Sequence, residues 1–337
     1  MTTVVLGWDA LDYELAEQFG TKEKFGKYNK CIDTFDNDVI GKPHTAELWP
    51  SIITGVGPET HGIYATSEGS ADWENPVVQT AANAAEHIIP DRLRTSIGAL
   101  LRAHGAEMRY PGPDYYDEEG VDTVFDGRRS LPIAIPNYRV DTDHRFGVLT
   151  DRGAQFAEYV DFDTSGEAGK WHEPGIPDHE FAELVTGKAV EKLGIVREAV
   201  QRDYDLVFVW LAYLDTVGHL DPVMREHGYQ KRAYRQAASW TEEVRSLLQP
   251  EDTLVCVSDH GLRKGYHTHD AYLGASEEEA IEDVETVLDV RNGVERVTNR
   301  SNTDSSPQIR PAYQQDPDRN HRDPESVREQ LSELGYI

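Results

Sequence analysis

The sequence has few cysteines and no long apolar segment. Cys31 and Cys256 are the two cysteines in 337 residues, and no CxxC pair occurs, so a disulfide framework is not expected. Each lies in an apolar, strand-like stretch, which predicts two buried structural thiols. No apolar segment approaches the ~20 residues that span a bilayer. No basic leader precedes the first expected strand at Thr3, so we expect a cytoplasmic protein that does not bind membranes.

The sequence is also poor in basic residues. Lys and Arg number 33 against 61 Asp and Glu, which gives a formal net charge of −28, and the acidic residues are spread along the whole chain. Such a surface repels nucleic acid and anionic membranes and excludes them as expected partners. With 38% apolar residues and several buried-strand patterns, the chain is not expected to be disordered. Our hypothesis is a halophilic protein that resembles haloarchaeal ones, because high salt screens this self-repulsion.

Three apolar runs predict buried parallel strands, and each ends in an aspartate. The longest is 206–214, followed by Asp215, Gly218 and His219. The others are 3–7, which leads to Asp9, and 253–257, which leads to Asp259 and His260. Long amphipathic helices are expected at 180–202 and 229–248. Strands that alternate with helices predict an α/β fold, with a doubly wound, mostly parallel central sheet and helices on both faces.

The remaining elements are shorter. Residues 1–64 and 201–337 are expected to form the core of the fold. Residues 65–200 are expected to supply some core helices and a cap or substrate-facing insertion, because 105–178 is rich in Gly, Pro, Asp and Tyr and forms a poor core. We further expect helices at 12–19, 91–104, 277–290 and 324–334, a strand within 31–40, β-like pieces at 123–125 and 133–138, and a long loop over 292–322.

Chemistry is expected at one edge of the sheet, since the carboxyl ends of parallel strands lie together. Three carboxylates and three imidazoles fit two divalent cations. Two cations ~4 Å apart can clamp an in-line displacement at phosphorus. Each residue alone has a simpler interpretation as a helix cap, a turn or a surface side chain, but together they favour a metal site. The candidate ligands are Asp9, Thr45, Asp215, His219, Asp259, His260 and either His267 or His269.

Thr45 lies in a segment, 42–63, that is dense in Pro, Thr, Gly and His. It precedes a short helical stretch that ends at Gly55. A hydroxyl at a helix N-terminus lies in positive potential near free N–H groups, which suits either a cap or a nucleophile that faces a phosphate. From these residues alone, the cap is the favoured role.

The motifs together resemble the alkaline phosphatase superfamily, and most closely its type I phosphodiesterase and nucleotide pyrophosphatase branch. Asp9 is similar to the first metal-ligand Asp of that family, and Thr45 lies nine residues before the Thr of a TG pair, where the family has its nucleophile. Residues 55–63 resemble the TG..P..HGI segment, 215–219 the D..GH motif, and 258–261 the SDHG motif. The matches run in order along the chain, and only about 65–200 lacks a counterpart.

The resemblance implies a metallohydrolase core with an alkaline phosphatase-like fold and two divalent metal ions, usually zinc and sometimes manganese. One ion would take Asp215, His219 and the late histidine, with His267 preferred to His269. The other would take Asp9, Thr45, Asp259 and His260. His61 is expected to support its loop structurally, and the role of His44 stays open.

The implied activity is hydrolysis of a small phosphorylated substrate, as a phosphodiesterase or phosphatase, through a Thr nucleophile and a phospho-Thr intermediate. The alternatives are a phosphonate hydrolase or phosphotransferase on the same site, and a degenerate metal-binding module without activity. Neither cysteine lies in a CxPxR-like segment, which argues against a sulfatase. Thr45 and the chain length argue against a cofactor-independent phosphoglycerate mutase.

Overall fold

The computed structural model describes residues 1–65, 111–149, 176–222, 224, 227–301 and 306–314, together with residues 328 and 332. The helices expected at 91–104 and 324–334 therefore lie outside the described residues, apart from two single positions. None of the described helices is long and apolar enough to cross a membrane.

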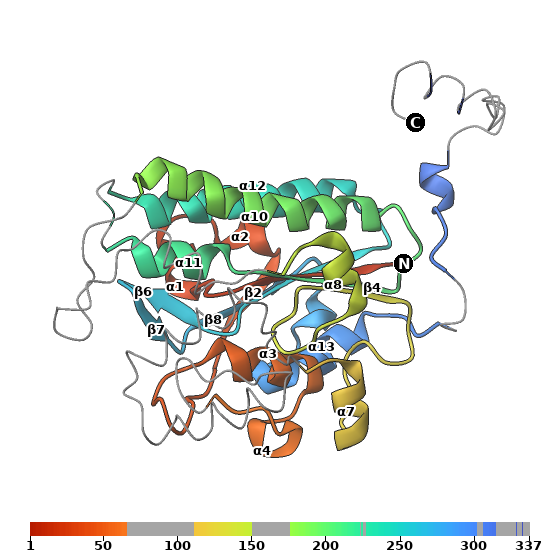
Figure 1. Ribbon diagram of the computed structural model, residues 1–337, viewed down its shortest axis with the longest axis horizontal. Coiled ribbons are helices and arrows are strands. Elements are labelled where there is room, and N and C mark those ends of the chain that lie inside the picture. The colour runs from red at the N-terminus through yellow and green to blue at the C-terminus, as the bar shows by residue number, and fades with distance from the viewer. Residues whose placement is uncertain are drawn as a thin grey trace.

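A six-stranded sheet forms the centre of the molecule, in the order β2-β8-β5-β1-β4-β3 (Figure 1). The neighbours β5, β1, β4 and β3 are parallel, whereas β8 is antiparallel to both β5 and β2. The mostly parallel sheet is thus confirmed. The strands are β1 (Thr3–Trp8), β2 (Tyr28–Ile32), β3 (Ser130–Ile133), β4 (Leu206–Leu211), β5 (Thr253–Val257) and β8 (Ala271–Ala275).

Helices cover both faces of this sheet. Figure 1 shows α10 (Asp178–Ala199) and α12 (Tyr229–Leu247) along one face, and α3 (Thr45–Thr54) and α13 (Val290–Arg296) on the other. Helices α10 and α12 confirm the two long amphipathic helices, each with its apolar stripe buried. The shorter helices are α1 (Tyr13–Gln18), α2 (Lys22–Phe25), α4 (Pro58–His61), α7 (Pro113–Glu119), α8 (Asp141–Phe146) and α11 (Tyr213–Leu220).

The three apolar runs form the central strands of the hydrophobic core. Every residue of β1, β4 and β5 is buried, as expected for strands covered on both faces. Gly7 allows α3 to approach β1 closely, because a Cβ at this position would lie 2.6 Å from the Trp49 ring. This close contact holds the start of α3 beside the carboxyl end of β1, and so places Thr45 near Asp9.

Several expected boundaries are wrong. Strand β4 ends at Leu211 rather than at residue 214, and α11 then begins at Tyr213, so Asp215 and His219 lie on a helix. The strand expected within 31–40 is β2, which lies earlier and overlaps that range only at residues 31–32.

The region after β8 also differs from the expectation. Two 3-10 turns, Glu278–Ala280 and Val287–Asp289, replace the helix expected at 277–290. Asp283 between them has a positive φ of 59°, which no α-helix accommodates. Helix α13 follows and occupies the start of the loop expected at 292–322, while the 3-10 turn Pro311–Tyr313 lies near the end of the described chain.

The segment expected to be a poor core contributes to the sheet. Strand β3 pairs in parallel with β4 at the sheet edge. The β-like piece expected at 123–125 is a turn, and only residue 133 of the piece expected at 133–138 belongs to a strand. Phe125, Ile135 and Tyr138 are nevertheless buried. The expectation of a poor core is therefore wrong for residues 124–138, while the division into core and insertion at 65–200 stays a prediction.

The two cysteines differ in environment. Cys256 in β5 is fully buried, but Cys31 on the edge strand β2 is only partly buried. The prediction of two buried thiols is thus wrong for Cys31. Burial raises the pKa of both thiols to about 12, so both stay protonated and unreactive at neutral pH.

Candidate metal centre

Asp9 follows β1 and lies at the centre of the site. Its side chain is fully buried, and its backbone N–H donates to the Leu211 carbonyl of β4 at 3.1 Å. Its Oδ1 lies 3.4 Å from the Thr45 hydroxyl and 3.4 Å from His260 Nε2. The structure therefore brings together three of the predicted residues, which are far apart in the chain.

Thr45 is the first residue of α3 and does not cap it. The N-cap is His44, whose Nδ1 accepts the Ala46 N–H at 3.3 Å. The cap favoured for Thr45 from the residues alone is therefore wrong. The hydroxyl instead lies 3.3 Å from His260 Nε2, on the side that faces Asp9. Gly55, with φ 73°, ends the helix as expected.

A second group of predicted residues lies on α11 and the small hairpin of β6 (Gly261–Arg263) and β7 (Tyr266–Thr268). Asp215 and His219 are one turn apart on α11, with Oδ1 and Nε2 3.2 Å apart. His267 on β7 brings its Nε2 to 3.0 Å from that of His219 and 3.9 Å from Asp215 Oδ1. Burial and the nearby His260 lower the pKa of His267 to about 3. The neutral imidazole is the form that binds metals.

Asp259 and His260 follow β5 and are fully buried. Asp259 Oδ1 accepts the Ala10 N–H at 3.4 Å, whereas Oδ2 accepts no hydrogen bond from any described residue and lies 3.5 Å from His260 Nε2. Burial and the charge of Asp9 raise the pKa of Asp259 to about 8. Burial acts to lower the pKa of His260, but Asp259 and Asp9 outweigh it and raise that pKa to about 10. In this environment positive charge is strongly favoured.

The imidazoles are oriented for ligation. His260 Nδ1 lies 3.0 Å from the Gly261 carbonyl, and His267 Nδ1 lies 2.7 Å from the Pro43 carbonyl. A carbonyl only accepts, so each Nδ1 carries a proton and each Nε2 faces the site, where the neutral form of the ring presents its lone pair to a cation.

Two sets of ligand atoms lie close enough to hold cations. Those of Asp215, His260 and His267 are within 4.8 Å of one another, as are those of Asp9, Asp259 and His260. Buried carboxylates face imidazole nitrogens, and such a mixed oxygen and nitrogen set suits divalent transition-metal cations. Both groups contain His260, but Asp215, His219 and His267 form a group without it, with ligand atoms 3.0–3.9 Å apart. The residues present thus fit two divalent cations.

The other histidines lie elsewhere. His269 is 53% exposed in its side chain and its Nε2 pairs with Asp36 at 2.7 Å, so it lies outside both ligand groups. His61 is buried, with Nε2 3.0 Å from the Ser51 hydroxyl and Nδ1 accepting the Ile63 N–H at 3.1 Å. These contacts agree with its expected structural role in the loop.

Sequence reasoning missed Trp210 in β4. Its indole Nε1–H donates to Asp9 Oδ2 at 3.0 Å, while the residue is only 5% exposed. A tryptophan near the end of a mostly aliphatic strand is the signal that could have identified it, although packing alone also explains an apolar run.

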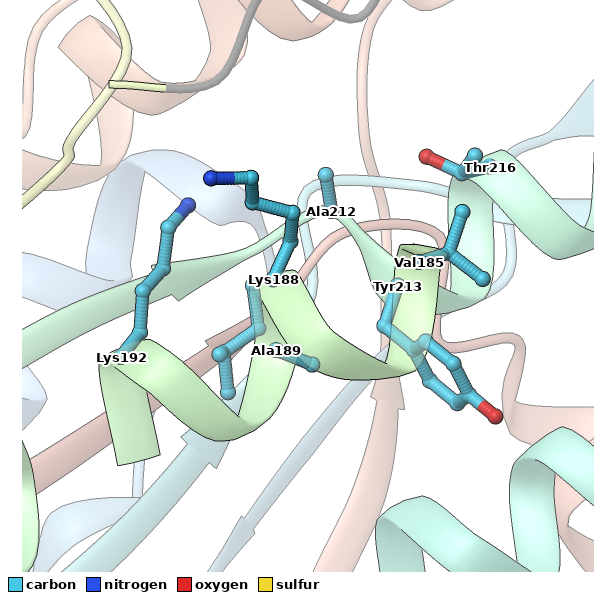
Figure 2. A pocket seen from close by; sticks show the side chains of 8 residues that line it. Val185, Lys188, Ala189, Lys192, Ala212, Tyr213 and Thr216 are labelled. Atoms are coloured by element: carbon cyan, nitrogen blue, oxygen red, sulfur yellow. The ribbon is translucent and has the colours of Figure 1, made fainter. Parts of the chain in front are cut away.

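A small pocket of about 20 Å³ lies beside the site, where α10 faces the end of β4 and the start of α11. Figure 2 shows Lys188 and Lys192 leaving α10 on the same side, with Ala212 and Thr216 opposite. This volume holds about one water molecule, so the pocket is too small to receive a substrate.

The fold and the two ligand groups define an α/β protein with a mostly parallel sheet and candidate sites for two metal ions. The chain belongs to the type I phosphodiesterase / nucleotide pyrophosphatase family, whose profile matches residues 3–335. This is a family of hydrolases that act on phosphoric ester bonds. No curated protein matches the sequence.

Several solved structures are similar to the chain. Murine ectonucleotide pyrophosphatase / phosphodiesterase 5 is 14% identical with a TM-score of 0.38, and the match covers 77% of this chain and 57% of the murine one. A Pyrococcus horikoshii protein is 12% identical with a TM-score of 0.44, with 90% and 99% covered. Alkaline phosphatase from the Antarctic bacterium TAB5 is 11% identical with a TM-score of 0.39. The match covers 88% of this chain and 97% of the alkaline phosphatase.

Proposed function

We propose that this protein is a metal-dependent hydrolase of small phosphoric esters, with Thr45 as the nucleophile. The observation that carries the proposal is the position of the Thr45 hydroxyl. It is buried at the start of α3, 3.4 Å from Asp9 Oδ1 and 3.3 Å from His260 Nε2, at the edge of the ligand groups. A threonine used only as a cap would instead turn its hydroxyl to the N–H groups of its own helix.

Two divalent cations, zinc or manganese, are proposed to bind the ligand groups. Asp215, His219 and His267 would hold one, and Asp9, Thr45, Asp259 and His260 the other. When bound, the cations lower the pKa of the Thr45 hydroxyl and neutralise charge on the phosphoryl oxygens.

The side chains of this protein then perform two displacements. Thr45 Oγ1 loses its proton to solvent and attacks phosphorus, and the bond from phosphorus to the leaving alcohol oxygen breaks. The resulting phospho-Thr45 is attacked by water, which restores the hydroxyl and releases the phosphate product. The positive end of α3 favours the added negative charge. Helix N–H groups contribute less than the sequence suggested, because those of Ala46 and Glu47 already donate to His44.

The family suggests a nucleotide-type phosphorylated substrate. The surface of this protein carries a net charge of −28, so a free nucleotide or other small ester suits it better than nucleic acid. Hydrolysis of bis-p-nitrophenyl phosphate, p-nitrophenyl phosphate and a phenylphosphonate ester, with and without an alcohol acceptor, separates diesterase, monoesterase, phosphonate hydrolase and phosphotransferase activities.

Substitution of Thr45 tests the nucleophile. Thr45→Ala should remove turnover of every ester, whereas Thr45→Ser keeps a hydroxyl and should retain measurable activity. Thr54→Ala is the matched control, because it removes a buried hydroxyl at the other end of the same helix, where Oγ1 donates to the Pro50 carbonyl. Rapid acid quench followed by peptide mass spectrometry should find phosphate on Thr45. Activity of Thr45→Ala equal to that of the control would falsify the assignment.

A further inference from the structure

The two oxygens of Asp9 have different surroundings. Oδ1 faces the Thr45 hydroxyl and His260 Nε2, both at 3.4 Å, and so points into the ligand group. Oδ2 points the other way and accepts the indole N–H of Trp210 at 3.0 Å. An indole N–H can only donate, so it fixes Oδ2 as an acceptor.

Strand β4 holds Asp9 at two points. Trp210 lies beside Gly7 in the parallel register of β1 and β4, two residues before Asp9, and its ring therefore reaches the Asp9 carboxylate. The next residue, Leu211, accepts the Asp9 backbone N–H at 3.1 Å. Both the backbone and the side chain of Asp9 are therefore set by the same short stretch of β4.

The Trp210 ring is in turn held by a buried lysine. Lys192 Nζ lies 4.6 Å from the centre of the ring and donates to the Trp210 carbonyl at 3.2 Å. Lys192 is only 2% exposed, and burying an ammonium in a protein core is costly. A cation over an indole face restricts the ring and is favourable where water is excluded. Figure 2 shows Lys192 on α10, from which it extends toward the end of β4.

We propose that Trp210 is a positioning residue that orients Asp9 to bind a cation through Oδ1 alone, and that Lys192 fixes the Trp210 ring. This inference rests on the metal centre of the proposed function. Hydrogen bonds to a ligating carboxylate fix its orientation, and loss of such a partner typically weakens metal binding by about 10–100-fold. Without the indole N–H, Oδ2 loses this hydrogen bond, and the orientation of the carboxylate toward Thr45 and His260 is held less firmly.

Direct metal titration of the metal-free full-length protein tests the inference. Trp210→Phe keeps an aromatic ring for Lys192 and removes the N–H. Trp240→Phe is its matched control, since Trp240 lies on α12 and packs its ring on Trp8 and Tyr213. Calorimetry with Zn²⁺ and with Mn²⁺ should show binding about 10–100-fold weaker in Trp210→Phe than in Trp240→Phe.

Lysine variants provide a second, independent pair in case Trp210→Phe does not fold. Lys192→Met removes the ammonium over the ring, whereas Lys188→Met removes the ammonium one turn earlier, where Lys188 pairs with Glu191 at 3.3 Å. Weaker metal binding in Lys192→Met alone supports the inference.

The outcomes separate this inference from the proposed function. If the wild-type protein binds neither metal, the metal centre itself is wrong. If the wild type binds metal and Trp210→Phe binds as tightly as Trp240→Phe, or Lys192→Met as tightly as Lys188→Met, the positioning role is overturned while the proposed function stands.

Discussion

Removal of the cations should destabilise the protein, because binding to the folded state alone shifts the unfolding equilibrium. The ligand atoms of Asp9, Asp259 and His260 lie within 4.8 Å of one another, an arrangement that the unfolded chain does not keep. Saturation with metal at about 1,000 times Kd contributes about 4 kcal/mol by linkage. We therefore expect the metal-loaded protein to be more stable by about 4 kcal/mol at that metal concentration.

The corresponding change in melting temperature is modest. At about 2.1 cal/mol/K per residue, a chain of this length unfolds with an entropy of about 0.7 kcal/mol/K, so 4 kcal/mol corresponds to about 6 °C. Differential scanning fluorimetry with EDTA, and with Zn²⁺ or Mn²⁺ added at constant ionic strength, measures the shift.

A highly acidic surface also binds divalent cations weakly, so the assay needs a charge-matched pair. Asp215→Asn/Asp259→Asn removes two carboxylates from the ligand groups and should lose most of the shift. Glu278→Gln/Glu279→Gln removes two exposed carboxylates and should keep it. Equal shifts in both double variants would refute the reasoning, since the stabilisation would then come from the surface.

Three further predictions follow from the same structure. His267→Ala should weaken metal binding at least about tenfold, whereas His269→Ala, which loses only an exposed pair with Asp36, should bind as the wild type does in calorimetry. Burial lowers the pKa of His61 from 6.5 to about 4, so the folded state binds fewer protons than the unfolded state in this range. The free energy of unfolding should therefore decrease by about 3 kcal/mol on account of His61 as pH falls from 6.5 to 4. Urea unfolding should show a smaller decrease over this range in His61→Gln. With a net charge of −28, the melting temperature should rise from low to molar KCl, and equal values would exclude the halophilic hypothesis.

The central strands and long helices could be predicted because their environments leave a simple pattern. Strands β1, β4 and β5 are covered on both faces and form unbroken apolar runs, while α10 and α12 show helical periodicity. The end of β4 could not be predicted. The apolar residues continue through Tyr213 and Leu214 into α11, and composition alone does not separate a buried strand from the buried first turn of a helix.

The edge strands gave weaker signals. Strands β2 and β3 have only five and four residues and are partly exposed, so neither shows a full apolar run. Inside 105–178, Gly and Pro concealed a set of buried aromatic residues that pack on one another and, through Phe125, on Phe208 of β4. Tertiary contacts of this kind leave no periodic trace in the sequence.

The candidate ligands were predicted more fully than the residues that position them. The aspartates at strand ends follow from the rule that parallel strands share a carboxyl edge. The resemblance preferred His267 to His269, and the structure places His267 Nε2 3.0 Å from His219 Nε2, while His269 pairs with Asp36. Trp210 was missed because its role depends on a contact across two strands that are distant in the sequence.

Anomalous diffraction from crystals grown with Mn²⁺ or Zn²⁺ tests the central claim most directly. We predict two peaks, one among Asp215, His219 and His267, and one among Asp9, Asp259 and His260 with the Thr45 hydroxyl in contact. Peaks confined to the surface, or a Thr45 hydroxyl remote from both cations, would contradict the account.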